Sequence, residues 1–165
     1  MKRLGFITSA IVAAAVLALS FAPSANAAGD KAKITDIEHK IIDATTADQV
    51  MKYYDKDDID LYDFHPPLQY AGSSAVSADL ADFFNNATDV KGVFVDLVVE
   101  TDGKMGMARS LQHFTWKGKD GKPGEGTFRV TDVYKKVGGQ WKVIHSHVSV
   151  PVDPSNGQAA MNLKS

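Results

Sequence analysis

Four long segments that alternate apolar and polar side chains constrain the fold of this chain most. They span residues 92–100, 104–116, 126–137 and 140–149. Such alternation is typical of β-strands. Asp102-Gly103 and Gly138-Gly139 suit two-residue turns that need positive φ, whereas the glycine-rich stretch 117–125 predicts a longer loop. The second half of the chain is therefore predicted to be an antiparallel sheet made of successive hairpins.

Short helices are predicted before this sheet. A capping box at 35–38 is expected to begin the first helix, and a second box at 46–49 opens another. Ser73 or Ser74 is expected to cap a third helix, whose apolar stripe is Val76, Leu80, Phe83 and Phe84. Brief strands are predicted at 59–64 and 68–70, interrupted by His65-Pro66-Pro67. The sequence thus indicates an α+β fold.

The N-terminal segment has the form of a signal peptide. A basic start, an apolar stretch at 7–19 and the small-x-small pattern Ala25-Asn26-Ala27 predict cleavage after Ala27. The chain is then predicted to consist of a signal peptide at 1–27, one domain at 28–153 and a flexible tail at 154–165. We expect a periplasmic or secreted protein without membrane attachment after cleavage. With 18 basic and 20 acidic side chains, the chain has no positive excess for binding nucleic acid.

The turn positions predict which side chains lie opposite one another. If Thr101 lies opposite Lys104, Asp96 lies opposite Arg109. If Val137 lies opposite Gln140, Asp132 lies opposite His145. Both faces of such a sheet are apolar, and three helices cover only one of them. A second copy of the chain is therefore expected to cover the face that bears Phe128, Tyr134, Trp141, His145 and His147.

The order of elements and the closing motif Trp141-x-x-x-His145-x-His147-x-Ser149 resemble the SnoaL-like branch of the nuclear transport factor two-like, or cystatin-like, superfamily. The closing motif is also similar to the association domain of calmodulin-dependent kinase II. The resemblance implies a cone-shaped curved antiparallel sheet packed on three N-terminal helices, with an apolar cavity and a dimeric or larger assembly. Arg109 and Arg129 match two cavity arginines of the kinase association domain.

These residues lead to a first functional hypothesis. Arg109, Arg129 and Asp96, with His113 and Tyr70, are expected to line the cavity and bind a small organic acid or carbonyl compound, because guanidinium groups pair well with carboxylates. The structural alternative is that Asp96 and Arg109 only form a cross-strand ion pair. His145 and His147 are interpreted as a hydrogen-bonded interface network, and neither a metal site nor a cofactor is predicted.

Two other functions remain open. Catalytic members of the superfamily, such as polyketide cyclases and ketosteroid isomerases, abstract a proton next to a carbonyl with a carboxylate whose pKa is raised by apolar surroundings. Asp96 or Asp63 is the candidate base here, Tyr54 a candidate donor and His113 a candidate proton shuttle. The third possibility is a non-catalytic oligomerisation domain.

Overall fold

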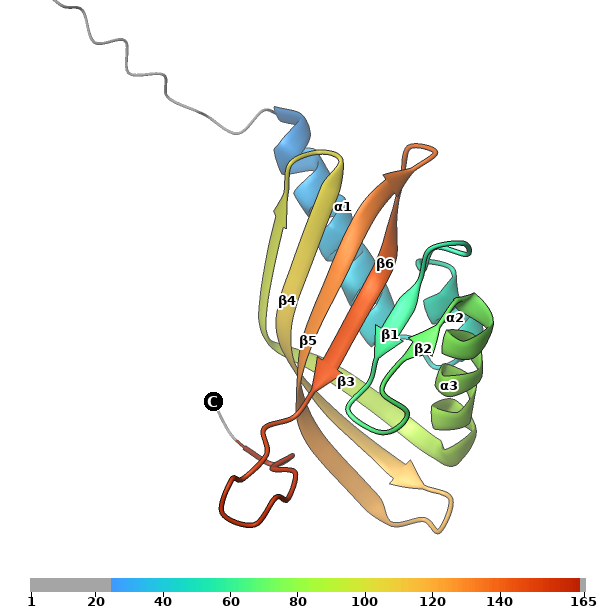
Figure 1. The fold of residues 1–165 in the computed structure, drawn as a ribbon, viewed down its shortest axis with the longest axis vertical. Helices are drawn as coiled ribbons and strands as arrows, with labels where there is room; N and C mark the ends of the chain where they lie inside the picture. Colours follow the sequence, from blue (N-terminus) through green and yellow to red (C-terminus); the bar gives the residue numbers. More distant parts are fainter. Residues whose placement is uncertain (1–24, 164–165) are drawn as a thin grey trace, which may run out of the picture.

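A six-stranded curved sheet with the order β2-β1-β6-β5-β4-β3 forms the body of the computed structural model, which describes residues 25–163 (Figure 1). The elements along the chain are α1 (Ala25–Ile42), α2 (Ala47–Met51), β1 (Asp60–Tyr62), β2 (Tyr70–Ala71), α3 (Ser73–Asn86), β3 (Ala87–Thr101), β4 (Met105–Gly118), β5 (Pro123–Val137) and β6 (Gln140–Ser149). All neighbouring strands are antiparallel except β1 and β6. The predicted α+β cone is confirmed.

Residues 1–24, which make up most of the predicted signal peptide, lie outside the residues that the structure describes. Within the described part of the chain, no helix is both long enough and apolar enough to cross a membrane. The C-terminal segment folds back on the sheet, because the Met161 carbonyl accepts a hydrogen bond from the Thr127 N–H at 2.7 Å. Whether residues 154–165 form a flexible tail stays a prediction.

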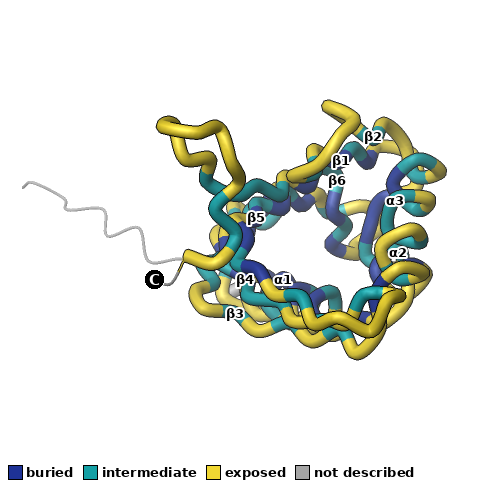
Figure 2. Tube along the Cα trace, turned by 90° about the horizontal axis from the view of Figure 1, so that it is seen from below, coloured by how far each residue is buried: buried dark blue, intermediate teal, exposed yellow. Residues whose placement is uncertain are grey.

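The sheet has an inner face, which packs on the helices, and an outer face. Figure 2 shows the strands curving around α1, with α2 and α3 opposite the sheet. At Gly106 of β4, an added Cβ would lie 2.5 Å from the Ile34 Cδ1 atom of α1. Only glycine allows α1 to lie this close to the strand. The buried side chains that fix the two layers together include Ile34, Val99, Tyr134, Trp141 and Val143.

Helix α1 is longer than predicted. It begins at Ala25, so Thr35 and Glu38 lie inside the helix and not at its start. The Thr35 hydroxyl donates to the Lys31 carbonyl at 3.0 Å, and Glu38 is 1% exposed against the sheet. The predicted capping box at 35–38 is therefore wrong, because no free N–H groups of a first turn exist at this position.

Of the caps predicted for the other two helices, one is confirmed and one is wrong. At α2 the Thr46 side chain accepts a hydrogen bond from the Gln49 N–H at 3.3 Å, which confirms Thr46 as the cap, while the Gln49 side chain accepts from the Thr45 N–H at 2.7 Å and not from that of Thr46. Helix α3 follows Gly72 and has no side-chain cap, so neither Ser73 nor Ser74 has the predicted capping role.

The hairpin between β3 and β4 departs from the predicted register by two residues. Thr101 lies opposite Gly106, so Asp96 lies opposite Leu111 and not opposite Arg109. The cause is the turn itself. The Asp102 carboxylate accepts hydrogen bonds from the N–H groups of both Lys104 and Met105 at 2.8 Å, which draws two further residues into the turn.

The hairpin between β5 and β6 begins as predicted and then shifts. Val137 lies opposite Gln140, with φ values of 56° and 82° at Gly138 and Gly139. A register shift between Val133 and Tyr134 then places His145 opposite Val133 and Ser146 opposite Asp132. The predicted pairing of Asp132 with His145 is wrong, because a bulge moves every later side chain of β6 to the other face.

The bulge and the helices together decide which side chains are inside. Phe128, Tyr134 and Trp141 are 6%, 0% and 4% exposed and lie on the inner face, within one copy of the chain. They are therefore unavailable as the core of a dimer interface, and this part of the prediction is wrong. His145 and His147 lie on the outer face, together with Arg129 and Val133.

Candidate functional site

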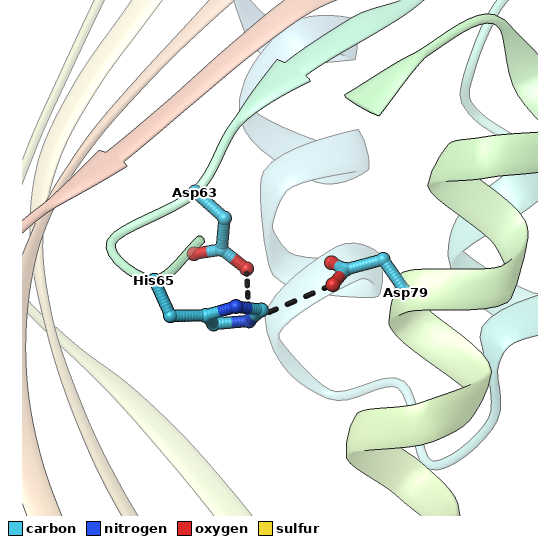
Figure 3. A group of neighbouring side chains, drawn as sticks. All are labelled: Asp63, His65 and Asp79. Atoms are coloured by element: carbon cyan, nitrogen blue, oxygen red, sulfur yellow. Dashed lines mark ion pairs between the residues drawn. The ribbon is translucent and has the colours of Figure 1, made fainter. Parts of the chain in front are cut away.

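Asp63, His65 and Asp79 converge where the loop after β1 meets α3 (Figure 3). The His65 Nε2 atom lies 3.2 Å from Asp63 Oδ2 and 3.5 Å from Asp79 Oδ1. The two carboxylates are well buried, with side chains 13% and 7% exposed, whereas the imidazole is 43% exposed. Figure 3 shows Asp79 extending from α3 toward the sheet and Asp63 meeting it from the opposite side. We call these three residues the acid cluster.

The local sequence explains this convergence. Asp79 lies three residues after Val76 and four before Phe83, so it shares the inward side of α3 with the predicted apolar stripe. The stretch from Asp63 to Pro67 leaves the strand and turns back, which carries His65 under α3. Tyr70 holds this loop, because its hydroxyl donates to the Pro66 carbonyl at 3.0 Å and lies 3.3 Å from His65 Nδ1.

Burial and mutual repulsion change the acidity of the cluster. Burial raises the pKa of Asp63 to about 6, and the nearby Asp79 carboxylate adds to the rise, while the Phe64 N–H and His65 oppose it. Burial and the hydrogen bond with Asp79 raise the pKa of Tyr70 to about 12. Asp63 is therefore a base with an affinity for protons near neutrality, and Tyr70 remains a hydrogen-bond donor.

An aromatic row extends from the acid cluster onto the inner face of the sheet. Ring centroids are 6.0 Å apart between Tyr70 and His65, 5.1 Å between His65 and Phe64, and 4.9 Å between Phe64 and Phe128. Phe114 follows, at 6.1 Å from Phe128. Phe64 is 44% exposed, so part of this apolar surface is open to a ligand. The acid cluster thus adjoins a surface suited to an aromatic or otherwise apolar molecule.

A second acidic group lies deeper between α1 and β5. Glu38 and Asp132 are 1% and 2% exposed, and the Tyr134 hydroxyl donates to Glu38 Oε1 at 2.6 Å. Burial, strengthened by the charge of Asp132, raises the pKa of Glu38 to about 9, and burial also raises that of Asp132 to about 6. We call Glu38 and Asp132 the buried carboxyl pair. Two carboxyls in such surroundings share a proton at neutral pH.

Tyr54 is buried close to the buried carboxyl pair. It is buried and forms a hydrogen bond with Ser146, which also bonds to Asp132. Burial raises the pKa of Tyr54, and the charges of Asp132, Glu38 and Asp63 raise it further. Its hydroxyl is therefore protonated, and Tyr54 has the proton that a hydrogen-bond donor needs. Among the predicted site residues, Asp63, Tyr54 and Tyr70 lie on the inner side.

The other predicted site residues lie outside. Arg109, Arg129 and Asp96 are exposed on the outer face, so the prediction that they line a cavity is wrong. Within residues 25–163, no ion pair joins Asp96 to Arg109, so the structural alternative is also not realised. His113 is on the outer face too, with Nδ1 3.1 Å from Thr127 Oγ1 and Nε2 3.9 Å from Glu125.

His145 and His147 contact β1 and not the buried carboxyl pair. His145 Nδ1 lies 2.7 Å from Asp60 Oδ1, and the rings of His145 and His147 are 4.7 Å and 6.0 Å from that of Tyr62. These contacts hold β1 parallel to β6 at Asp60, Leu61 and Tyr62. The histidines of the closing motif therefore stabilise the pairing of β1 with β6 inside the sheet.

Four residues of these acidic groups and the aromatic row were not predicted from the sequence: His65, Asp79, Phe64 and Glu38. The signal for Asp79 was available, because the helical spacing that identified Val76, Leu80 and Phe83 also places Asp79 inward. The same helical spacing places Glu38 on the inward side of α1, because it lies four residues after the buried Ile34. The position of His65 depends on how the loop folds back, which no local pattern specifies.

The acid cluster also has the composition of a metal site. One imidazole nitrogen and two carboxylate oxygens lie within 4.8 Å of one another. Nitrogen and oxygen ligands of this kind suit a divalent transition metal, although a fourth protein ligand is not among the described residues of the group.

A separate hollow of about 760 Å³ lies at the tip of the β4–β5 hairpin. It is lined by Asp89, Lys91, Thr115, Trp116, Lys117, Pro123, Gly124 and Glu125. Asp89 and Lys117 pair with each other at 2.7 Å, and none of the predicted site residues lines this hollow. The acid cluster is therefore the stronger candidate for a functional site.

Comparison with known proteins supports the fold. Residues 33–153 match the SnoaL-like domain family, while none of the curated proteins compared matches the sequence. A nuclear transport factor 2-like protein of unknown function from Pseudomonas putida KT2440 is similar in structure, with a TM-score of 0.75 and 26% identity over 84% of this chain and 98% of that chain.

Two further solved structures share the fold. A ketosteroid isomerase-like protein from Erwinia carotovora atroseptica has a TM-score of 0.63 and 18% identity, over 73% of this chain and 95% of its own. A proposed calcium/calmodulin dependent protein kinase II association domain from Xanthomonas campestris has a TM-score of 0.61 and 23% identity, over 73% of this chain and 84% of its own. These similarities extend to the architecture alone.

Proposed function

Because the chain belongs to the SnoaL-like domain family, we propose that it binds a small, partly apolar molecule on the inner face, beside the acid cluster. The observation that carries this proposal is the pair of buried carboxylates facing each other across His65, next to the aromatic row. Small-molecule sites combine an apolar lining with a few convergent polar groups. This arrangement replaces the arginine-lined cavity expected from the sequence.

The proposal is tested with a neutral aromatic ketone, phenylacetone, in a thermal-shift assay. Binding to the folded state raises the melting temperature as the ligand concentration increases. We expect a rise for the wild type and for the Asp96→Asn control on the outer face, and a smaller rise for Phe64→Ala, which removes the exposed part of the aromatic row. Equal shifts in Phe64→Ala and the wild type would place binding elsewhere.

A second candidate function, proton abstraction next to a carbonyl, is favoured by the raised pKa of Asp63. A carboxylate with a pKa of about 6 is a stronger base than an exposed one, and Asp63 lies beside the aromatic row on which a carbonyl compound would bind. Deuterium exchange into the methylene group of phenylacetone, followed by NMR, measures this activity. Exchange should disappear in Asp63→Asn and persist in Asp96→Asn.

The third possibility, a non-catalytic oligomerisation domain, predicts that Asp63→Asn and Asp96→Asn behave alike in both assays. We retain the proposal that a second copy of the chain covers the outer face. Its support is the exposed apolar side chains Val93, Val95 and Met105, which are 57%, 47% and 40% exposed. Light scattering of Val95→Asp should report a folded monomer where the wild type is a dimer.

We also retain the proposal of export, for which the pattern of residues 1–27 is the support. Mass spectrometry of the protein recovered from a bacterial periplasm should give a chain that starts at Ala28. An intact N-terminus on the recovered protein would contradict processing after Ala27.

A further inference from the structure

Four polar side chains meet on the outer face of the sheet, on the neighbouring strands β4, β5 and β6 (Figure 1). Arg109 of β4 and His147 of β6 lie directly opposite Thr131 of β5, one on each side of it. Arg129 lies two residues before Thr131 and therefore points to the same face. Opposed residues of neighbouring strands are about 5 Å apart, and residues two apart on one strand are about 7 Å apart. The four side chains therefore surround one point, and we call them the arginine group.

The fold itself makes almost no use of the arginine group. The two arginines and the histidine are exposed, and the threonine is half-buried. Within residues 25–163, no hydrogen bond or ion pair joins any of the four side chains to another residue. The only ring contact is that of His147 with Tyr62, at 6.0 Å between centroids. The donors of all four side chains are thus free to bind a molecule from outside.

The arginine group carries uncompensated positive charge. A guanidinium group stays protonated in proteins, so Arg109 and Arg129 supply two positive charges on neighbouring strands, where like charges repel each other. Asp96 and Glu100 of β3 lie diagonally across from Arg109, and neither forms an ion pair with it. An anion between the two guanidinium groups would replace this repulsion with attraction. A phosphate monoester carries nearly two negative charges and three acceptor oxygens, so it matches two arginines better than a carboxylate does.

From this register and charge we propose that the arginine group binds the phosphate group of a small phosphate monoester. Each guanidinium group offers a planar fork of N–H donors that fits two phosphate oxygens. The Thr131 hydroxyl and the ring of His147 supply the remaining donors. The sequence analysis expected Arg109 and Arg129 to bind an anion inside a cavity, whereas this site lies on the open side of the sheet.

The arginine group is separate from the other sites proposed above. The acid cluster and the aromatic row lie on the inner face, so the two faces can be tested independently. The exposed apolar side chains proposed to contact a second copy belong to β3 and to the first residue of β4, and none of them is in the arginine group. Failure of one proposal therefore leaves the others unaffected.

An NMR titration of the folded protein tests the proposal with methyl phosphate, dimethyl phosphate and acetate. At pH 8 the monoester has two negative charges, because its second pKa is about 6, whereas the other two probes have one. Ionic strength is kept constant, since exposed charges are screened by salt. We expect methyl phosphate to shift the Thr131 amide signal with saturation and to bind about ten-fold more tightly than either monoanion. Amide signals of the acid cluster should not move.

Variants then locate the site. Arg109→Gln and Arg129→Gln should each weaken the binding of methyl phosphate about ten-fold, and Arg129→Lys should weaken it less, because it keeps the charge and loses the fork. The matched control is Lys135→Gln, which removes an exposed cation of β5 that pairs with Asp58 at 3.3 Å. This variant should bind methyl phosphate as the wild type does. Circular dichroism checks that all four variants are folded.

Four results would overturn the proposal. Equal losses in Lys135→Gln and Arg129→Gln would indicate a general attraction of anions to the outer face. Acetate or dimethyl phosphate binding as tightly as methyl phosphate would exclude the monoester as the preferred class. Shifts that do not saturate with any probe would show that no site exists. If no probe binds and the arginine variants change the mass measured by light scattering, the arginines hold a second copy of the chain instead.

Discussion

The two faces of the same sheet differ in both charge and exposure. On β4 and β5 the inner positions hold Ser110, Gln112, Asp132 and Tyr134, which are buried, whereas Arg109 and Arg129 alternate with them on the outer face and are exposed. The inner face is acidic and aromatic, and the outer face carries the guanidinium groups. Charged residue types on a strand therefore say little about a site until the register assigns them to a face.

The comparison also shows what each face requires of its polar groups. An exposed guanidinium group is solvated by water and needs no partner. Glu38, by contrast, is buried and needs the Tyr134 hydroxyl and a proton to remain inside the fold. Substitutions at matched inner and outer positions should therefore have unequal effects, and four experiments measure the difference.

The largest effect is expected from Trp141→Ala on the inner face. This change removes a side chain that is 4% exposed and the hydrogen bond from Trp141 Nε1 to Asp30 Oδ1 at 3.1 Å. Loss of a buried aromatic side chain typically lowers the free energy of unfolding by about 3–5 kcal/mol. Urea denaturation followed by circular dichroism gives the value. A change below about 1 kcal/mol would place Trp141 on an exposed face.

A smaller loss is expected from Tyr134→Phe. The substitution keeps the ring and removes only the hydroxyl that donates to Glu38, so a buried acceptor loses its partner. The free energy of unfolding should fall by about 1–3 kcal/mol. Tyr62→Phe, at a side chain that is 40% exposed, is the control and should be nearly neutral. Similar losses in both variants would contradict the burial of the carboxyl pair.

A gain of a few degrees in melting temperature is expected from Asp63→Asn at pH 7.5. The folded-state pKa of Asp63 is raised from 3.8 to about 6, so folding favours the protonated form. The stability that this group contributes is present below pH 4 and is lost as the pH rises to about 6. The gain should therefore shrink as the pH falls below 6. Calorimetric scans of both proteins across this range measure it, and a gain independent of pH would indicate another cause.

The smallest effect is expected from Arg109→Ala on the outer face. An exposed side chain with no ion pair to Asp96 should change the free energy of unfolding by about 0.5 kcal/mol or less. Urea denaturation next to Trp141→Ala makes the contrast between the faces direct. A loss of several kcal/mol would mean that Arg109 is buried in an assembly of the protein.

The sequence patterns predicted the fold well because they repeat. The alternation in the four long strands and the glycines of the last hairpin are local signals, and the predicted helix cap at Thr46 is confirmed. The site was predicted less well, because its residues depend on features without a repeating pattern. The turn at Asp102 and the bulge in β6 each changed the partner of a candidate residue, and the loop that positions His65 has no periodicity.

Residue type alone also misled the choice of site. Arg109 and Arg129 were selected because they match two cavity arginines of a similar family and because guanidinium groups pair well with carboxylates, but both lie on a face that helices do not cover. Asp63 and Tyr54 were weaker candidates from the sequence and are the ones that the structure brings to the interior. Helical spacing was a better guide to burial than charge was, as Asp79 and Glu38 show.

The bond between Trp141 and Asp30 has a consequence for synthesis. It joins residues that are 111 positions apart, at the beginning of α1 and the beginning of the last strand. Such distant contacts close only after most of the chain is available, and they slow folding. Helix α1 therefore reaches its final packing only after the last hairpin has been made, so the core of a nascent chain stays incomplete until translation is nearly finished.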